Sequence, residues 1–191
     1  GIIGEEYGRT RESASRQWVL DPIDGTQSFV AGRPIFGTLI ALMQDGWPVL
    51  GVIDQPITKE RWVGRIGEGT TLNGKPVKTR TCAGVEGMSL ATTSPHCFDA
   101  EQSDAWLNLV VNAYPKKPFP VYGGDCYNYA MLASGHVDCV MEAGLKIHDY
   151  AALVPVVEGA GGVLSAWQGN PLDQDSDGTV IALGDPARIE D

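Results

Sequence analysis

The stretch WVLDPIDGTQSF, residues 18–29, ends an apolar run in two aspartates that flank Pro-Ile, and it then turns at Gly-Thr. Pro22 fixes its own φ angle and favours an extended conformation for Asp21. We therefore expect the strand 18–20 to stop there, with the Asp21 carboxylate at the end of a sheet. Asp24 follows three residues later and can return to the same side. Two such carboxylates raise each other's pKa unless a proton or a cation lies between them, so the pattern predicts either a capped turn or a cation site.

The residues around Asp24 add a second binding feature. The bend leaves the Ile23 carbonyl free, and Mg²⁺ accepts a mixture of carboxylate and carbonyl oxygens. Gly25 and Thr26 open a short helical stretch, TQSF, whose backbone N–H groups and dipole favour a phosphate. Metal ligands beside anion-binding amides are more specific for phosphate chemistry than either feature alone.

Composition excludes several classes of protein. The 191 residues are 43% hydrophobic, which allows one large domain or two small ones with a substantial core. The formal net charge of -10 argues against nucleic acid as a partner. No apolar run is long enough for a membrane span and the first residues do not resemble a secretory signal, so we expect a cytoplasmic protein with no membrane partner. The four cysteines are far apart, without C-x-x-C spacing, and are expected to be reduced thiols.

The chain divides into two halves by its pattern. Residues 1–85 are rich in predicted strands, at 36–43, 48–53 and 60–66, and the first two are joined through Asp-Gly at 45–46, which favours a tight hairpin. We expect this half to form an antiparallel sheet that carries the metal site.

Residues 86–191 alternate between strands and helices and are expected to form an α/β half on the substrate side of one compact catalytic unit. The predicted strands are 88–91, 137–141, 163–167 and 179–183, and the predicted helices are 104–114, 125–134 and 149–161. Pro155 lies inside the last helix, and we predict a kink there rather than two helices.

Three motifs are spread along nearly the whole chain, and they occur in the order in which one protein family has them. They are Gly4-Glu5-Glu6, the stretch 18–26, and His148-Asp149 followed by Ala151-Ala152 and EGAGG at 158–162. Together they resemble the inositol monophosphatase family of magnesium-dependent, lithium-sensitive phosphatases. The resemblance implies an α+β fold, a layered αβαβα sandwich, and a homodimer. The family's helical segment before Gly-Glu-Glu is absent from the sequence given; if the polypeptide starts at Gly1, we expect exposed apolar surface and impaired stability and activity.

The resemblance also implies a role for each site residue. The metal ligands for two or three Mg²⁺ ions are Glu5, Asp21, the Ile23 carbonyl, Asp24 and Asp149. Glu5 and Thr26 match the pair that orients the attacking water, Asp24 completes the catalytic set, and the amides of Gly25 and Thr26 match the phosphate cradle. These assignments agree with hydrolysis by metal-activated water, without a covalent phosphoenzyme. His148, where many members have tryptophan, could tune Asp149 or simply pack.

Substrate choice is expected to depend on residues outside the metal cluster. The strings GVIDQP at 51–56 and GGDCYNYA at 123–130 resemble the histidinol-phosphate phosphatase branch. Histidinol phosphate carries an ammonium and an imidazole, with which Asp125 and Glu142 could form charge-assisted hydrogen bonds. Ser94 is a further candidate for the substrate side. The alternatives are that Asp125 only caps its helix and that Glu142 is only a charge at the end of a strand.

The favoured reaction is Mg²⁺-dependent hydrolysis of histidinol phosphate to histidinol and phosphate in histidine biosynthesis. Inositol phosphate or a broad set of sugar phosphates is the nearest alternative. A bisphosphatase would need an Arg/Lys cluster that the sequence lacks. A homologue that keeps the metal site without catalysis is the alternative from another class, although such a protein has no need of Glu5 and Thr26.

The acidic stretch 173–178 is interpreted as a turn. It begins like a calcium-binding EF-hand loop, but the twelfth position is Gly184 rather than glutamate.

Overall fold

The first sheet is built from the N-terminal part of the chain. The computed structural model describes residues 1–6, 8–115 and 120–189. Within them the sheet has the order β2-β1-β3-β4-β5-β6-β7-β8, and only β1 and β3 pair in parallel. The strands are β1 Ile2–Gly4, β2 Gly8–Thr10, β3 Arg16–Asp24, β4 Gly37–Gln44, β5 Trp47–Gln55, β6 Glu60–Arg65, β7 Gly69–Leu72 and β8 Lys75–Val77. The predicted antiparallel pairing of the strands now seen as β4, β5 and β6 is confirmed.

Two local features of this sheet follow from its sequence. Asp45 and Gly46 join β4 to β5 with φ angles of 52° and 88°, the positive values that a tight hairpin requires. Ile2 and Trp18 are register partners across β1 and β3 and remain 44% and 43% exposed. Two apolar side chains of neighbouring strands are thus accessible near this edge of the sheet.

The sequence predicted that the strand would stop at Leu20. In the structure, strand β3 instead continues to Asp24. Its register with β4 shifts between Asp21, opposite Leu39, and Asp24, opposite Gly37. Three steps along β3 thus face two steps along β4, which is a β-bulge. Pro22 within the bulge has no N–H to donate to the ladder, and its carbonyl accepts a hydrogen bond of 2.8 Å from the Thr38 hydroxyl. The proline bends the strand without ending it.

The second sheet belongs to the C-terminal part of the chain. It has the order β10-β9-β11-β13-β12 and combines parallel and antiparallel pairs. Its strands are β9 Leu90–Thr92, β10 Val121–Tyr122, β11 Cys139–Glu142, β12 Val163–Ser165 and β13 Val180–Leu183. The helices of the chain are α1 Thr26–Val30, η1 Pro95–Cys97, α2 Ala100–Ala113, α3 Cys126–Ala133, α4 Ile147–Tyr150, α5 Leu153–Gly159 and η2 Pro186–Arg188. All four cysteines are free thiols.

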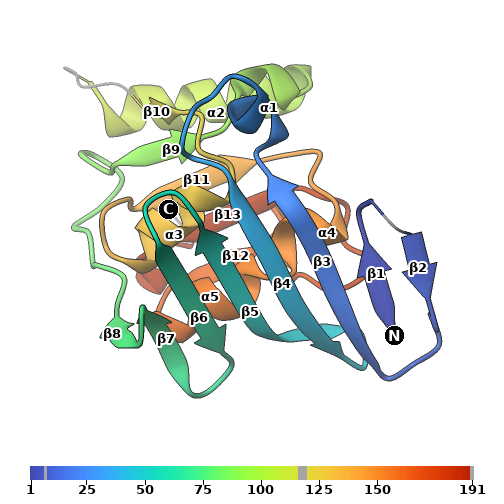
Figure 1. Cartoon of the computed structure of the whole chain (residues 1–191). Coiled ribbons are helices and arrows are strands. Elements are labelled where there is room, and N and C mark those ends of the chain that lie inside the picture. The colour runs from blue at the N-terminus through green and yellow to red at the C-terminus, as the bar shows by residue number, and fades with distance from the viewer. Residues whose placement is uncertain (7, 116–119, 190–191) are drawn as a thin grey trace.

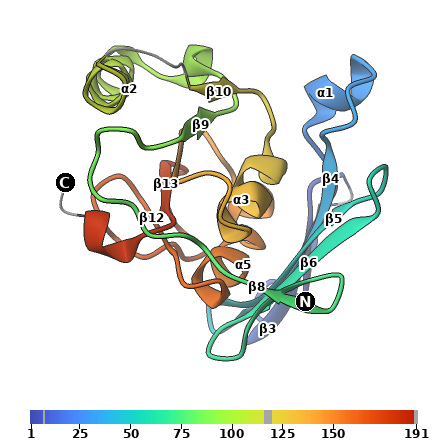
Figure 2. The same cartoon turned by 90° about the vertical axis from the view of Figure 1, so that its left-hand side faces the viewer.

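Helices α3 and α5 lie between the two sheets, and α2 covers the far side of the second sheet (Figures 1 and 2). The predicted layered α+β class is confirmed. Helix α2 begins at Ala100, four residues before the predicted start. The reason is a capping box, in which the Asp99 carboxylate accepts from the Gln102 N–H and the Gln102 side chain accepts from the Asp99 N–H.

The prediction of a single kinked helix over 149–161 is wrong, because the structure has two helices, α4 and α5. The intervening Ala151 and Ala152 keep right-handed helical angles. Pro155 is the third residue of α5, and it has no N–H to donate to the carbonyl four residues earlier, at Ala151. The missing hydrogen bond explains why the break precedes the proline.

Helix α5 approaches the first sheet over two glycines. Gly51 of β5 and Gly64 of β6 are buried register partners. A Cβ at Gly51 would collide with the Ala152 carbonyl, and one at Gly64 would collide with the backbone of Pro155 and Val156. The absent side chains let the helix backbone lie directly on the strands. This contact fixes the position of α4, which immediately precedes α5.

Two further expectations concern individual segments. Residues 173–178 form the predicted turn, in which Asp173 accepts from the Asp175 N–H and Asp177 accepts from the Thr179 N–H. In the described parts of the chain, no helix is long and apolar enough to cross a membrane.

Candidate active site

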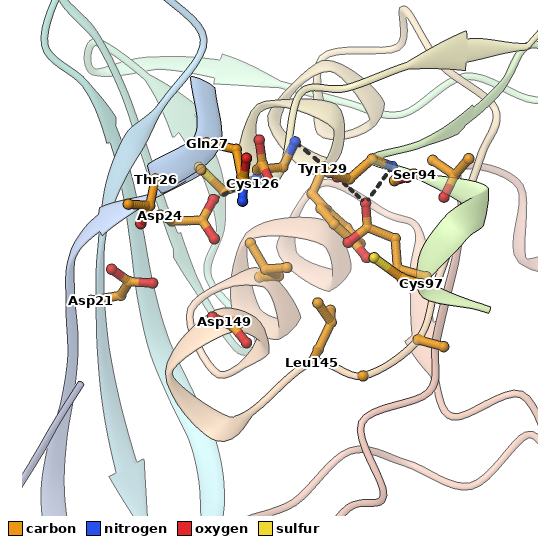
Figure 3. Close-up of a pocket in the computed structure, with 18 of the residues that line it drawn as sticks. Asp21, Asp24, Thr26, Gln27, Ser94, Cys97, Cys126, Tyr129, Leu145 and Asp149 are labelled. Atoms are coloured by element: carbon orange, nitrogen blue, oxygen red, sulfur yellow. Dashed lines mark hydrogen bonds between the residues drawn. The ribbon is translucent and has the colours of Figure 1, made fainter. Parts of the chain in front are cut away.

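Three carboxylates from two distant parts of the chain meet at one end of a cavity. One oxygen each from Asp21, Asp24 and Asp149 lies within 4.8 Å of the other two. The two aspartates on β3 flank the bulge, which brings both to the same side, and Asp149 comes from α4. Figure 3 shows the three side chains grouped on one side of the pocket. The structure thus brings together residues that are 125 positions apart in sequence, from 24 to 149.

Glu5 lines the same cavity, at the level of Asp21. It directly follows β1, whose parallel pairing places Gly4 opposite Leu20, and its N–H donates to the Leu20 carbonyl at 3.2 Å. The Nε2 atom of His148 lies 3.8 Å from a Glu5 oxygen and 3.6 Å from an Asp149 oxygen. A protonated His148 could therefore pair with both carboxylates.

The bend after Asp24 places the remaining residues predicted for this end. Gly25 has left-handed angles (φ 80°, ψ 39°), and Thr26 is the first residue of α1. The Thr26 hydroxyl donates to the Ile23 carbonyl at 3.0 Å. A Cβ at Gly25 would lie 2.9 Å from an Asp125 oxygen, so a side chain at this position would be both strained and crowded.

The charges of the three carboxylates are poorly compensated by protein groups. Burial, together with the charges of Asp24 and Glu5, raises the pKa of Asp21 to about 8. Burial raises the pKa of Asp24 to about 7, although its carboxylate accepts a 2.7 Å hydrogen bond from the Cys126 N–H. Burial also raises the pKa of Asp149. Clustered oxygen donors whose ionised forms repel one another suit a hard divalent cation such as Mg²⁺.

The raised pKa values predict how stability depends on pH. Asp21 has a reference pKa of 3.8 and a folded value of about 8, so the folded protein binds more protons than the unfolded chain between these values. The free energy of unfolding of metal-free protein should therefore fall as pH rises from about 4 to about 8. Mg²⁺ should reduce this fall because it stabilises the ionised carboxylates. Thermal unfolding at pH 5 and pH 8, with and without Mg²⁺, measures both effects; a metal-free protein more stable at pH 8 would contradict the assignment.

The cavity, of about 250 Å³, is also lined by Glu142 and by Asp125, whose carboxylate lies against Gly25. The Thr93 hydroxyl accepts from the Asp125 N–H at 3.0 Å and donates to the Glu142 carboxylate at 2.5 Å. The Thr93 N–H donates to the same Glu142 oxygen at 2.9 Å. Glu142 is 5% exposed, and burial raises its pKa to about 8. Thr93 thus holds both acidic residues in place.

Asp125 does not cap α3 with its side chain, which removes one alternative raised by the sequence. Its carboxylate instead faces α1, where the Ser28 hydroxyl donates to it at 3.4 Å. The backbone of Asp125 has φ 46° and ψ −132°, an unusual conformation for a residue with a side chain. Such strain is common where a structure fixes a functional side chain. Ser94 also lines the cavity and caps η1 by accepting from the His96 N–H.

Three hydroxyl residues that line the cavity were not predicted from the sequence: Thr92, Thr93 and Tyr129. Thr92 and Thr93 immediately precede Ser94, and their position at the end of a predicted strand could have suggested them. Tyr129 lies within a predicted helix, where its side-chain direction depends on how that helix packs. No signal in the sequence distinguishes it from an ordinary core tyrosine.

A match to the inositol monophosphatase family covers residues 1–189. The chain is 51% identical over 183 residues to the chloroplastic bifunctional phosphatase IMPL2 of Arabidopsis thaliana, covering 95% of this chain and 52% of that protein. It is 32% identical over 183 residues to a histidinol-phosphatase of Chlorobaculum parvum, covering 95% of this chain and 69% of that protein. The chain therefore spans about half the length of the plant relative.

The fold matches a solved structure of an inositol monophosphatase from Zymomonas mobilis. The TM-score is 0.93 at 50% identity, and the match covers 100% of this chain and 72% of the solved one. The layered sandwich predicted by family resemblance is thus the observed fold.

Proposed function

Because this chain belongs to the inositol monophosphatase family, we propose that it is a Mg²⁺-dependent phosphomonoesterase that hydrolyses histidinol phosphate to histidinol and phosphate. One observation carries the proposal. A single cavity is lined by the grouped carboxylates of Asp21, Asp24 and Asp149 and also by the acidic side chains of Asp125 and Glu142. The grouped aspartates suit an anion held through cations, and the other two carboxyl groups suit a cationic organic group.

The metal end would hold two or three Mg²⁺ ions through Glu5, the three aspartates and the Ile23 carbonyl. When bound, Mg²⁺ would lower the pKa of water and offset the negative charge of the phosphate. Glu5 and Thr26 would orient the attacking water, and the Thr26 hydroxyl is already held by its hydrogen bond to the Ile23 carbonyl. The amides of Gly25 and Thr26 would bind phosphate oxygens.

Asp125 and Glu142 would bind the ammonium and imidazole of histidinol phosphate. Asp125 and Glu142 are fixed through Thr93, so they are oriented before the substrate arrives. Ser94, beside them in the lining, would contact the same part of the substrate. In this proposal residues 86–191 supply the substrate side, whereas residues 1–85 supply most metal ligands.

The Asp125→Asn variant should lose kcat/KM for histidinol phosphate by about tenfold, because a hydrogen bond to a charged group is replaced by one to a neutral amide. The loss should come from KM, and kcat/KM for myo-inositol 1-phosphate should change less than about twofold. Asparagine retains the shape that packs against Gly25. Steady-state kinetics with both esters measures the split, and equal losses on the two substrates would show that Asp125 has only a structural role.

Inositol phosphate is the second candidate substrate. The Zymomonas structure carries the name of an inositol monophosphatase, and the plant relative is called bifunctional. Phosphate release from histidinol phosphate and from myo-inositol 1-phosphate, measured side by side with Mg²⁺, tests the choice. A preference for histidinol phosphate supports the proposal, whereas a preference for the inositol ester replaces its substrate. Release from neither ester, nor from sugar phosphates, would instead indicate a non-catalytic homologue.

We further propose, from family membership, a cytoplasmic homodimer inhibited by Li⁺. Light scattering measures the dimer, and a monomer at working concentration would contradict it. Inhibition of phosphate release by LiCl, with NaCl as the matched salt, tests the effect of Li⁺.

A further inference from the structure

Two buried hydroxyl groups of residues that line the cavity form no hydrogen bond of regular geometry with a described residue, although the Tyr129 hydroxyl lies next to the Glu142 carboxyl group. They are the Tyr129 OH and the Thr92 Oγ1, and both residues are 1% exposed. A buried hydroxyl without a partner is unfavourable, and native proteins contain few of them. Because both residues line the cavity, a bound molecule is one means of completing their hydrogen bonds.

Both hydroxyl residues belong to the substrate end of the cavity. Thr92 is the last residue of β9 and directly precedes Thr93, which holds Glu142. Tyr129 comes from α3, and Figure 3 shows it across the pocket from the three aspartates, on the side of Ser94 and Cys97. Burial and the nearby charge of Glu142 raise the pKa of Tyr129 well above its usual value, so this hydroxyl stays protonated.

The cavity lining favours a cationic group at this position. Six lining residues carry carboxyl groups, and the described lining includes no lysine, arginine or histidine. Of the basic groups described beside the cavity, His148 lies near Glu5 and Asp149, whereas the Arg33 guanidinium lies against Gly123 and partly offsets the charge of Asp125. A bound cationic N–H group would favour the ionised forms of Glu142 and Asp125 and be attracted by them, and hydroxyl oxygens can accept hydrogen bonds from its remaining N–H groups.

We infer that Tyr129 and Thr92 form a hydrogen-bonding subsite that selects phosphate esters whose opposite end carries cationic N–H donors. The inference rests on the proposed function for the ester, and it adds two specificity-determining residues to it. The two hydroxyls accept N–H donors while the neighbouring carboxylates supply the charge.

The Tyr129→Phe variant removes one hydroxyl and keeps the ring. KM for histidinol phosphate should rise about tenfold, and kcat should change less than about twofold. Propyl phosphate has no distal N–H group, so its kcat/KM should stay within about twofold of the wild-type value. The melting temperature should fall less than in a variant that loses a regular hydrogen bond, because the Tyr129 hydroxyl forms none with the protein. Thr92→Val should shift the kinetic values in the same direction.

The matched control is Tyr114→Phe, since the Tyr114 hydroxyl accepts a 2.7 Å hydrogen bond from the Leu90 N–H. This variant should lower the melting temperature and leave the preference between the two esters unchanged. The inference is overturned if Tyr129→Phe behaves like this control, or if it slows both esters equally.

Binding of histidinol, which lacks the phosphate, separates this inference from the proposed function. Thermal shift with millimolar histidinol should stabilise the wild-type protein more than Tyr129→Phe, whether or not any ester is hydrolysed. A wild-type protein that hydrolyses nothing but shows this difference would refute the proposed function alone. Equal stabilisation of both proteins, or of neither, would refute the subsite.

Discussion

The Asp21→Asn variant is expected to lose at least about a hundredfold in Mg²⁺-dependent phosphate release. Residues that merely support a metal ligand contribute about 10–100-fold to metal affinity or activity, so a direct ligand should contribute no less. Asparagine keeps the oxygen that accepts the 2.9 Å hydrogen bond from the Ile23 N–H. The substitution therefore removes charge while preserving the turn, and phosphate release at saturating Mg²⁺ measures the result.

Stability measurements show whether this loss is due to unfolding. Without metal at pH 8, Asp21→Asn should be at least as stable as the wild type, because it removes repulsion with Asp24. Mg²⁺ at a hundred times its dissociation constant should stabilise the wild type by about 2.7 kcal/mol and the variant by much less. Asp104→Asn, at an exposed position of α2, is the control for loss of one carboxylate. Full activity in Asp21→Asn would show that Asp21 is not a metal ligand.

The Gly51→Ala variant is expected to destabilise the fold by about 3 kcal/mol, at the upper end of the usual cost of overpacking. The new methyl group would collide with the Ala152 carbonyl, which is backbone and cannot rotate away. For a chain of this size the melting temperature should fall by roughly 10 °C. Displacement of Ala152 should also move Asp149, three residues earlier, so activity should fall in the protein that remains folded.

Gly84→Ala is the matched control for this substitution. Gly84 has no heavy atom within 4 Å of the position of a Cβ, and its φ angle is not positive. Thermal unfolding of the two variants isolates the collision from the general effect of replacing glycine by alanine. A Gly51→Ala protein as stable as Gly84→Ala would show that α5 does not depend on this close approach.

The antiparallel pairing of β4, β5 and β6 and several other elements could be predicted because their signals are local, whereas β1, β2, β7, β8 and β10 were not predicted. The Asp-Gly at 45–46 and the apolar runs beside it define the β4–β5 hairpin without help from distant residues. The same local reasoning misplaced the end of β3, since Pro22 can be accommodated in a bulge when a partner strand lies alongside. It also missed the break between α4 and α5.

The candidate site could be predicted only where family motifs include its residues. Asp21, Asp24 and Asp149 lie in such motifs, and the structure brings them together. Thr93 and Tyr129 were missed because the role of each depends on its position beside Glu142. Glu142 lies 49 residues after Thr93 and 13 residues after Tyr129 in the sequence. The packing role of Gly51 depends likewise on Ala152, which belongs to the other half of the chain.

The most direct test of the metal-dependent mechanism is phosphate release from histidinol phosphate by the metal-depleted protein as Mg²⁺ is restored. We predict no release in EDTA and full recovery on addition of excess Mg²⁺, with no recovery in Asp21→Asn. Release that continues in EDTA, or that Mg²⁺ restores equally in Asp21→Asn, would contradict catalysis through this carboxylate cluster.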